Sequence, residues 1–166
     1  MLQIRLFGGF EAREGNEVLP FAESARAQSF LGFLLMHQET SQPRQRLAFL
    51  LWPDSTEAQA RTNLRHLLHN VRRLLPELDR FLEVSPQALR WKPDAPFWLD
   101  VTAFENAITH AGRVRGSDAE VPALREAITL YSQDLLDGFY DEWLAGPRER
   151  LRQSYLTALE RLTSLL

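Results

Sequence analysis

The first twenty residues contain short segments in which apolar and polar side chains alternate, the pattern of strands with one buried face. Residues 2–7 alternate in this way, the Gly8-Gly9 pair interrupts the pattern, and residues 10–13 resume it. A third short apolar segment follows at 18–21. These segments predict a small antiparallel sheet at the N-terminus.

From residue 23 onwards the apolar side chains recur at intervals of three and four, which is typical of amphipathic helices. The pattern predicts three helices, at 23–37, 43–52 and about 55–75. Two short apolar segments at 81–84 and 88–91 then predict a β-hairpin. The expected order is therefore a sheet, three helices and a hairpin.

The start of the third helix carries a capping signal. Asp54 precedes the helix and Glu57 follows three residues later, which is the spacing of a capping box. The sequence therefore predicts that Asp54 is the N-terminal cap.

The segment 92–96 contains two prolines and predicts a linker. Beyond it the spacing is helical, at 101–111, 121–136 and 148–166, without a regular 34-residue repeat. We therefore expect two domains, 1–96 and 97–166. The last helix has neither a glycine cap nor a proline stop, so we expect the second domain to be truncated here.

Bulk composition narrows the class of protein. The chain has no cysteine, which excludes disulfides and thiolate metal sites and fits a reducing cytoplasm. No apolar run approaches the roughly 18 residues of a membrane span. We therefore expect a cytoplasmic protein without a membrane partner.

The net charge of −3 argues against a nucleic-acid partner, but its distribution favours one. Residues 1–99 carry a net charge of +1, and residues 100–166 carry −4. Within 44–73, six arginines face only two acidic residues, a net charge of +4. Phosphate contacts depend on local potential, so this basic stretch outweighs the total.

The third predicted helix separates an apolar stripe from a face of basic and amide side chains, with no acidic residue between 61 and 73. Arginine and asparagine are the side chains that pair with guanine and adenine edges in the major groove, which admits a helix. A solvated basic face explains this helix alone equally well. The hairpin favours DNA binding, because Arg90 and Lys92 flank Trp91 at its end; a purely structural hairpin with Trp91 in the core is the alternative.

Several segments make the chain resemble a known family. The stretches RQRLAFLLWPDS at 44–55, ARTNLR at 60–65 and VRRL at 71–74 resemble the OmpR/PhoB-type winged helix. The resemblance is to the version in bacterial activators of the Streptomyces antibiotic regulatory protein type. Three further stretches resemble the bacterial transcriptional activator domain that follows in those proteins: WLDVTAFE at 98–105, LDGFYDEW at 136–143 and RERL at 148–151.

This resemblance implies an α+β fold: a four-stranded N-terminal sheet, a winged helix-turn-helix, and an all-α, tetratricopeptide-like segment. In larger family members an ATPase module follows. The resemblance also implies that the loop between the second and third helices can touch RNA polymerase. Asp54 and Ser55 are the candidates here, with capping the default explanation of Asp54.

We therefore expect a sequence-specific, double-stranded DNA-binding regulator of transcription, without catalytic activity or a cofactor. The helix at about 55–75 enters the major groove and the hairpin at about 81–92 is the wing. Base contacts are expected from Arg65, His66, His69, Asn70 and Arg73, and phosphate contacts from Arg44, Arg61, Arg72, Arg90 and Lys92.

The helical segment would relay contacts to a second protomer, so a homodimer on repeated half-sites is a candidate assembly. His66 and His69 have a spacing that suits metal, but no third ligand is close in sequence, and no metal is expected. One alternative function is a protein-interaction module of a larger signalling ATPase. The other is an enzyme fragment whose catalytic part lies outside these residues.

Overall fold

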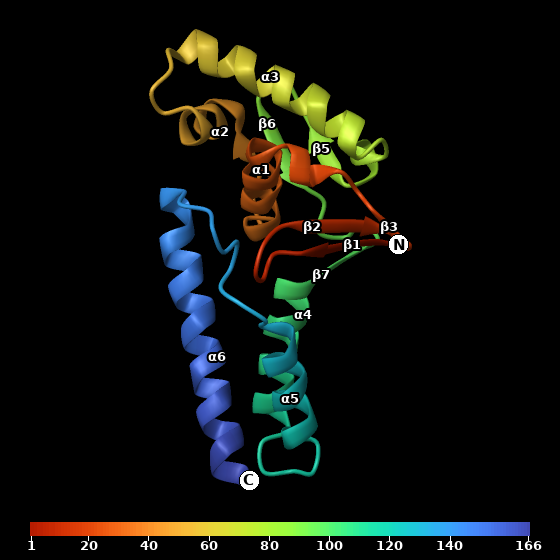
Figure 1. The fold of residues 1–166 in the computed structure, drawn as a ribbon, viewed down its shortest axis with the longest axis vertical. Coiled ribbons are helices and arrows are strands. Elements are labelled where there is room, and N and C mark those ends of the chain that lie inside the picture. The colour runs from red at the N-terminus through yellow and green to blue at the C-terminus, as the bar shows by residue number, and fades with distance from the viewer. The chain divides into compact units, whose positions relative to one another are not determined.

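The computed structural model describes residues 1–166 and divides into two compact units. One unit comprises Met1–Gly15 and Phe97–Leu166, and the other comprises Asn16–Pro96. Helices and short strands make this an α+β protein, as predicted, and none of the helices combines the length and hydrophobicity of a membrane span (Figure 1). One boundary between the units lies after residue 96, but residues 1–15 group with the C-terminal segment. The division into the domains 1–96 and 97–166 therefore stays a prediction.

The discontinuous unit contains a sheet in which β1 is central. β1 (Leu2–Arg5) pairs antiparallel with β2 (Glu11–Glu14) and parallel with β7 (Phe97–Leu99). Leu2 and Ile4 are buried, in agreement with the alternating pattern. β7 was not predicted, because three residues are too few to show an alternation and the preceding prolines suggested a linker running into a helix.

A buried carboxylate joins the end of β1 to the start of α4 (Asp100–Arg113). Asp100 Oδ1 accepts hydrogen bonds from Leu6 N at 2.9 Å and Val101 N at 2.8 Å. Asp100 Oδ2 accepts hydrogen bonds from Leu6 N and Phe7 N, each at 3.0 Å. Burial raises the pKa of Asp100, while these N–H groups act in the opposite direction.

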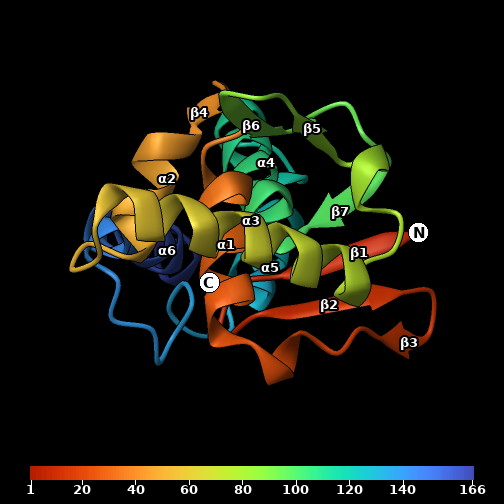
Figure 2. The same cartoon turned by 90° about the horizontal axis from the view of Figure 1, so that it is seen from above.

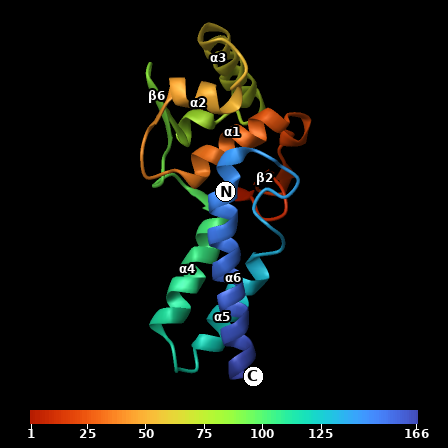
Figure 3. The same cartoon turned by 90° about the vertical axis from the view of Figure 1, so that its left-hand side faces the viewer.

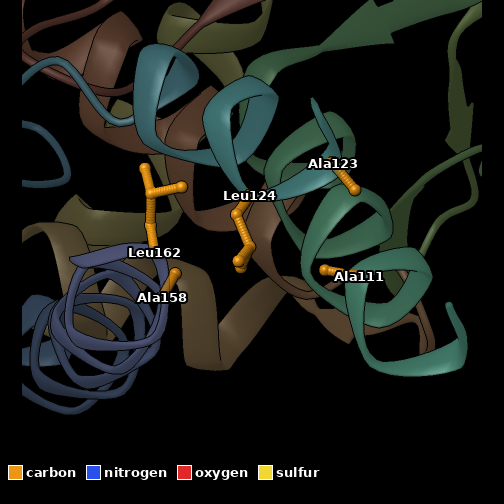
Figure 4. Close-up of a cluster of buried hydrophobic side chains, with 5 residues drawn as sticks. All are labelled: Ala111, Ala123, Leu124, Ala158 and Leu162. Carbon is orange, nitrogen blue, oxygen red and sulfur yellow. The ribbon is translucent and has the colours of Figure 1, made fainter. Parts of the chain in front are cut away.

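Three helices make up the rest of this unit. α4 packs against α5 (Glu120–Leu130), and α6 (Ala145–Leu165) packs along α5 (Figures 1 and 3). A short 3₁₀ turn, Glu142–Leu144, precedes α6. Figure 4 shows the apolar cluster that the three helices share, with Leu124 in the middle: Ala111, Ala123, Leu124, Ala158 and Leu162.

The expected helix at 121–136 is wrong at its C-terminal end, since α5 ends at Leu130. The following residues pair with the backbone that leaves β1: Gly8 N donates to Asp134 O at 2.9 Å, and Leu136 N donates to Leu6 O at 2.7 Å. Leu136 has a φ of 44°, which a right-handed α-helix does not allow. Pairing with a segment more than a hundred residues away thus overrides the local helical pattern.

Arg148, in the first turn of α6, holds this non-helical segment in place. Its guanidinium donates to the carbonyl oxygens of Leu135 at 2.7 Å and Phe139 at 2.6 Å, and also to that of Leu136. Charge-assisted bonds from one planar group to three carbonyls compensate for the helix hydrogen bonds that these residues lack.

Glu120 and Arg161 form a two-point ion pair between α5 and α6. Arg161 Nε donates to Glu120 Oε2 at 2.7 Å and Nη2 donates to Oε1 at 3.0 Å, while Gly116 N donates to Oε1 at 2.9 Å. Only 4% of the Glu120 side chain is exposed. The hydrogen bonds from Arg161, followed by that from Gly116, lower the pKa of Glu120 from 4.5 to about 2.

This shift predicts how acid affects the α5–α6 contact. A carboxylate whose pKa is depressed in the folded state stabilises the fold above its unfolded pKa, and the contribution is lost as the pH falls towards the folded value. Wild-type stability is expected to fall between about pH 4.5 and about pH 2, and Glu120→Gln should remove this part of the decline. Urea unfolding of both proteins at several pH values measures it. Equal pH dependence of the two proteins would contradict the prediction.

The continuous unit holds the remaining elements. They are β3 (Glu17–Val18), a 3₁₀ turn at Phe21–Glu23, α1 (Ala25–Met36), β4 (Gln42–Pro43), α2 (Arg44–Leu51), α3 (Glu57–Leu74), a 3₁₀ turn at Leu78–Arg80, β5 (Leu82–Val84) and β6 (Ala88–Trp91). The three helices and the hairpin lie where the pattern predicts them. The expected strand at 18–21 is shorter, because a 3₁₀ turn begins at Phe21.

The hairpin belongs to a three-stranded sheet of order β4-β6-β5. β4 contributes only two residues, Gln42 and Pro43, which pair with Leu89 and Ala88, and it was not predicted. Trp91 is fully buried, as expected, and stacks on Phe81 with 5.6 Å between ring centroids. Figure 2 shows α3 crossing over α1, with α2 beside its N-terminal part.

Candidate nucleic-acid interface

α3 presents two different faces, as the sequence pattern predicts. Its apolar stripe is buried against α1 and α2 and consists of Ala60, Leu64, Leu67, Leu68, Val71 and Leu74. Because these side chains point inward, helical geometry turns the basic positions outward or to the two edges.

The N-terminal cap of α3 is Thr56, so the prediction of Asp54 was wrong. Thr56 has extended backbone angles, and its Oγ1 accepts a hydrogen bond from Gln59 N at 3.1 Å. The spacing from Thr56 to Gln59 also fits the capping-box pattern, which thus begins two residues after Asp54. Glu57 is the first residue of α3, where its negative charge interacts favourably with the helix dipole.

This correction predicts unequal effects for two neighbouring substitutions. Thr56→Ala should lower the free energy of unfolding by about 1 kcal/mol, because an N–H of the first turn loses its acceptor. Asp54→Ala should change it by less than about 0.5 kcal/mol, because Asp54 is exposed and caps nothing. Urea unfolding compares the two variants, and the reverse ranking would restore Asp54 as the cap.

The outward face of α3 contains the expected base-contacting side chains. Arg65, His66, His69 and Arg73 are exposed, and Asn70 is half-buried at the edge. Arg65 Nη2 donates only to Thr62 Oγ1, at 3.2 Å, within the same helix. The other four side chains make no hydrogen bond or ion pair within the protein, and no acidic side chain lies on this face. Their polar groups therefore face solvent with their bonding capacity unused.

Two of the expected phosphate contacts are engaged in exposed ion pairs. Arg61 Nη2 lies 3.3 Å from Glu57 Oε1, and Arg72 Nη2 lies 3.4 Å from Asp79 Oδ1. Exposed pairs of this kind contribute at most about 1 kcal/mol, so an approaching phosphate can replace the carboxylate.

The other three expected phosphate contacts hold main-chain carbonyls, a role that sequence reasoning missed. Arg44 Nε donates to Ser85 O at 2.9 Å, and Lys92 Nζ donates to Asp79 O at 2.9 Å. Arg90 donates to Gln38 O at 2.8 Å and to Glu39 O at 3.1 Å. Arg90 thus ties β6 to the segment after α1, and its replacement is expected to affect folding as well as any phosphate contact.

A hollow of about 650 Å³ lies beside α3, between α2 and the turn of the β5–β6 hairpin. Arg44 and Phe49 line it from α2, Arg61 and Arg65 line it from α3, and Pro86 lines it from the hairpin turn. Sequence reasoning missed Phe49, of which 69% is exposed. Its position in the helix could have indicated this exposure, because residue 49 lies outside the buried stripe of α2 that contains Leu47 and Leu51.

The remaining predictions concern the loop before α3 and a possible metal site. Asp54 and Ser55 are exposed in the loop between α2 and α3, and Ser55 also borders the hollow. His66 and His69 have no third ligand beside them, and no group of three or more metal-ligating side chains occurs in the structure.

The elements thus define a class of α+β protein in which a helix with a basic outer face lies beside a β-hairpin, together with a helical unit. The same fold occurs in the solved structure of Mycobacterium tuberculosis EmbR in complex with a low affinity phosphopeptide. The two share 18% sequence identity and a TM-score of 0.79, over 97% of this chain and 44% of the EmbR chain. This chain therefore spans less than half the length of EmbR.

No family model and no curated protein sequence matches the chain. The likeness to EmbR thus shows a shared fold. This shared α+β fold agrees with the fold class that the family resemblance implied, while the winged helix-turn-helix and the tetratricopeptide-like segment stay predictions.

Proposed function

We propose that this chain is a regulator of transcription that binds double-stranded DNA sequence-specifically through a winged helix-turn-helix. In this proposal α2 and α3 form the helix-turn-helix, and the β5–β6 hairpin is the wing. The observation that carries it is the outward face of α3, which is exposed, free of acidic side chains and without internal partners at His66, His69 and Arg73. The EmbR-like fold and the family resemblance support the same class of function.

The proposed geometry places α3 in the major groove. Arginine can pair with a guanine edge through two hydrogen bonds and asparagine with an adenine edge, which makes Arg65, Arg73 and Asn70 the strongest candidates for base readout. His66 and His69 lie on the same face and complete the set of base contacts. Arg61 and Arg72 are the phosphate contacts that require least rearrangement; Arg44, Arg90 and Lys92 would have to share their donors with main-chain carbonyls.

The remaining parts of the proposal concern proteins. The exposed pair Asp54 and Ser55 would face RNA polymerase, and Asp54 is available for this contact because Thr56 is the residue that caps α3. The α4–α6 unit, which we infer to be tetratricopeptide-like, would join two protomers on repeated half-sites. Neither part requires catalysis or a cofactor, and we propose none.

Selection of bound duplexes from a random pool tests the function directly. An enriched motif is expected, with binding that falls steeply as salt increases, because each phosphate contact contributes about 0.9 to the slope of log K against log salt. A pool without enrichment, or binding that does not respond to salt, would contradict the proposal. It would favour instead the use of the same unit for protein contacts alone.

A further inference from the structure

Phe49 is the large apolar side chain that the continuous unit leaves most exposed. It lies on α2, and 69% of its surface is accessible, although Leu47 and Leu51 of the same helix are buried. An exposed phenylalanine does not contribute the free energy that its burial would add to folding. The packing of α2 therefore does not explain why residue 49 is a phenylalanine.

The surroundings of Phe49 combine apolar and basic groups. The hollow of about 650 Å³ is lined by apolar residues, among them Phe49, Trp52 and Pro86, and by three arginines, Arg44, Arg61 and Arg65. Its acidic lining residue, Glu57, is paired with Arg61. The charge of the hollow therefore suits a ligand that has anionic groups next to apolar ones.

A DNA strand has this alternation, since each phosphate is followed by a deoxyribose whose C–H surface is apolar. The hollow is continuous with the outward face of α3, because Arg61 and Arg65 line it and Arg65 also belongs to that face. A duplex lying against α3 would thus bring one of its backbones to the hollow.

We propose that this hollow holds one sugar–phosphate strand of the bound duplex, with Phe49 packed on deoxyribose and Arg44 and Arg61 on the flanking phosphates. The proposal rests on the proposed function and adds an apolar, sequence-independent contact to it. Such a contact releases no counterions, so its contribution does not depend on salt, in contrast to an arginine–phosphate contact.

Fluorescence anisotropy tests this proposal by measuring how tightly the full chain binds a selected duplex at several salt concentrations. Phe49→Ala is expected to weaken binding roughly four- to tenfold at every salt concentration, with the slope of log K against log salt unchanged. Phe49→Leu should retain most of the affinity, because it keeps much of the apolar surface. Arg61→Ala should instead lower the slope by about 0.9.

Val18→Ala is the matched control, since Val18 is also apolar and 52% exposed in this unit but does not line the hollow. It should bind as wild type does. Because Phe49 is exposed, thermal unfolding of Phe49→Ala should match that of the wild type, which distinguishes weaker DNA binding from a destabilised fold.

Three results would overturn the inference: unchanged affinity of Phe49→Ala, a reduction equal to that of Val18→Ala, or a changed salt slope in Phe49→Ala. All three leave the proposed function standing, because the wild type still binds the duplex. Failure of the wild type to bind any duplex would overturn both. Unchanged DNA affinity together with loss of binding to RNA polymerase would assign the hollow to a protein partner instead.

Discussion

Replacing Asp100 by asparagine is expected to lower the free energy of unfolding by about 3 kcal/mol. Both carboxylate oxygens accept from main-chain N–H groups, and the side chain is 2% exposed, so water cannot replace a missing acceptor. An asparagine amide would turn its NH₂ group towards Val101 N or Phe7 N, depending on its orientation, and leave that buried donor without an acceptor. Such a donor costs about 1–3 kcal/mol, and the charge-assisted bonds that the substitution removes are among the stronger ones.

The pH dependence of this site has a definite sign. Because burial raises the pKa of Asp100 above its usual 3.8, the unfolded chain releases this proton at a lower pH than the folded chain does. Its contribution to stability is therefore largest at low pH and declines as the pH rises from about 3.8 through the folded value. This direction is opposite to that of Glu120, so the two carboxylates can be distinguished in the same titration.

Urea unfolding at neutral pH measures the change in stability, and hydrogen exchange locates it. Faster exchange is expected at the amides of Leu6, Phe7 and Val101, whose hydrogen bonds to this side chain are weakened or lost. Asp118→Asn is the control, because Asp118 is exposed in the loop between α4 and α5 and makes no side-chain hydrogen bond. Unchanged stability and exchange in Asp100→Asn would show that the carboxylate does not hold β1 to α4.

Replacing Arg65 or Arg73 by alanine is expected to weaken binding to a selected duplex by roughly 1–3 kcal/mol each, and to relax the preference for one base pair. Both side chains are exposed and bound to no acidic group, so their removal should leave the fold unchanged. Binding to non-selected duplexes should fall less, because base readout contributes little there.

Competition between selected and random duplexes measures both effects. Arg125→Ala is the matched control, since it removes an exposed arginine from α5 and should bind as wild type does. If Arg65→Ala and Arg73→Ala both bind the selected duplex as tightly as the wild type, the face assigned to DNA is wrong.

Local pattern predicted the elements whose signal lies within their own residues. The stripe that includes Leu64, Leu68 and Val71 placed α3 and its outward face, and the two apolar segments around residue 86 placed the hairpin. Both follow from side-chain periodicity, which requires no knowledge of the rest of the chain.

The features that were missed depend on partners distant in sequence. β7 exists because it pairs with β1, and α5 ends at Leu130 because the next residues pair with residues 6–8. The carbonyl contacts of Arg90 depend on where the segment after α1 runs. The cap of α3 is an exception: its signal was local, but two overlapping capping patterns were present and backbone angles decided between them.

The parallel pairing of β1 with β7 also has a consequence for synthesis on the ribosome. Leu6 and Asp100 are separated by 94 positions, and the whole unit with the basic helix lies between them. At about 5–20 residues per second, that unit emerges over roughly 4–16 seconds before β7 does. The continuous unit can thus fold during translation, while the first strand, which left the tunnel earlier, still lacks its parallel neighbour.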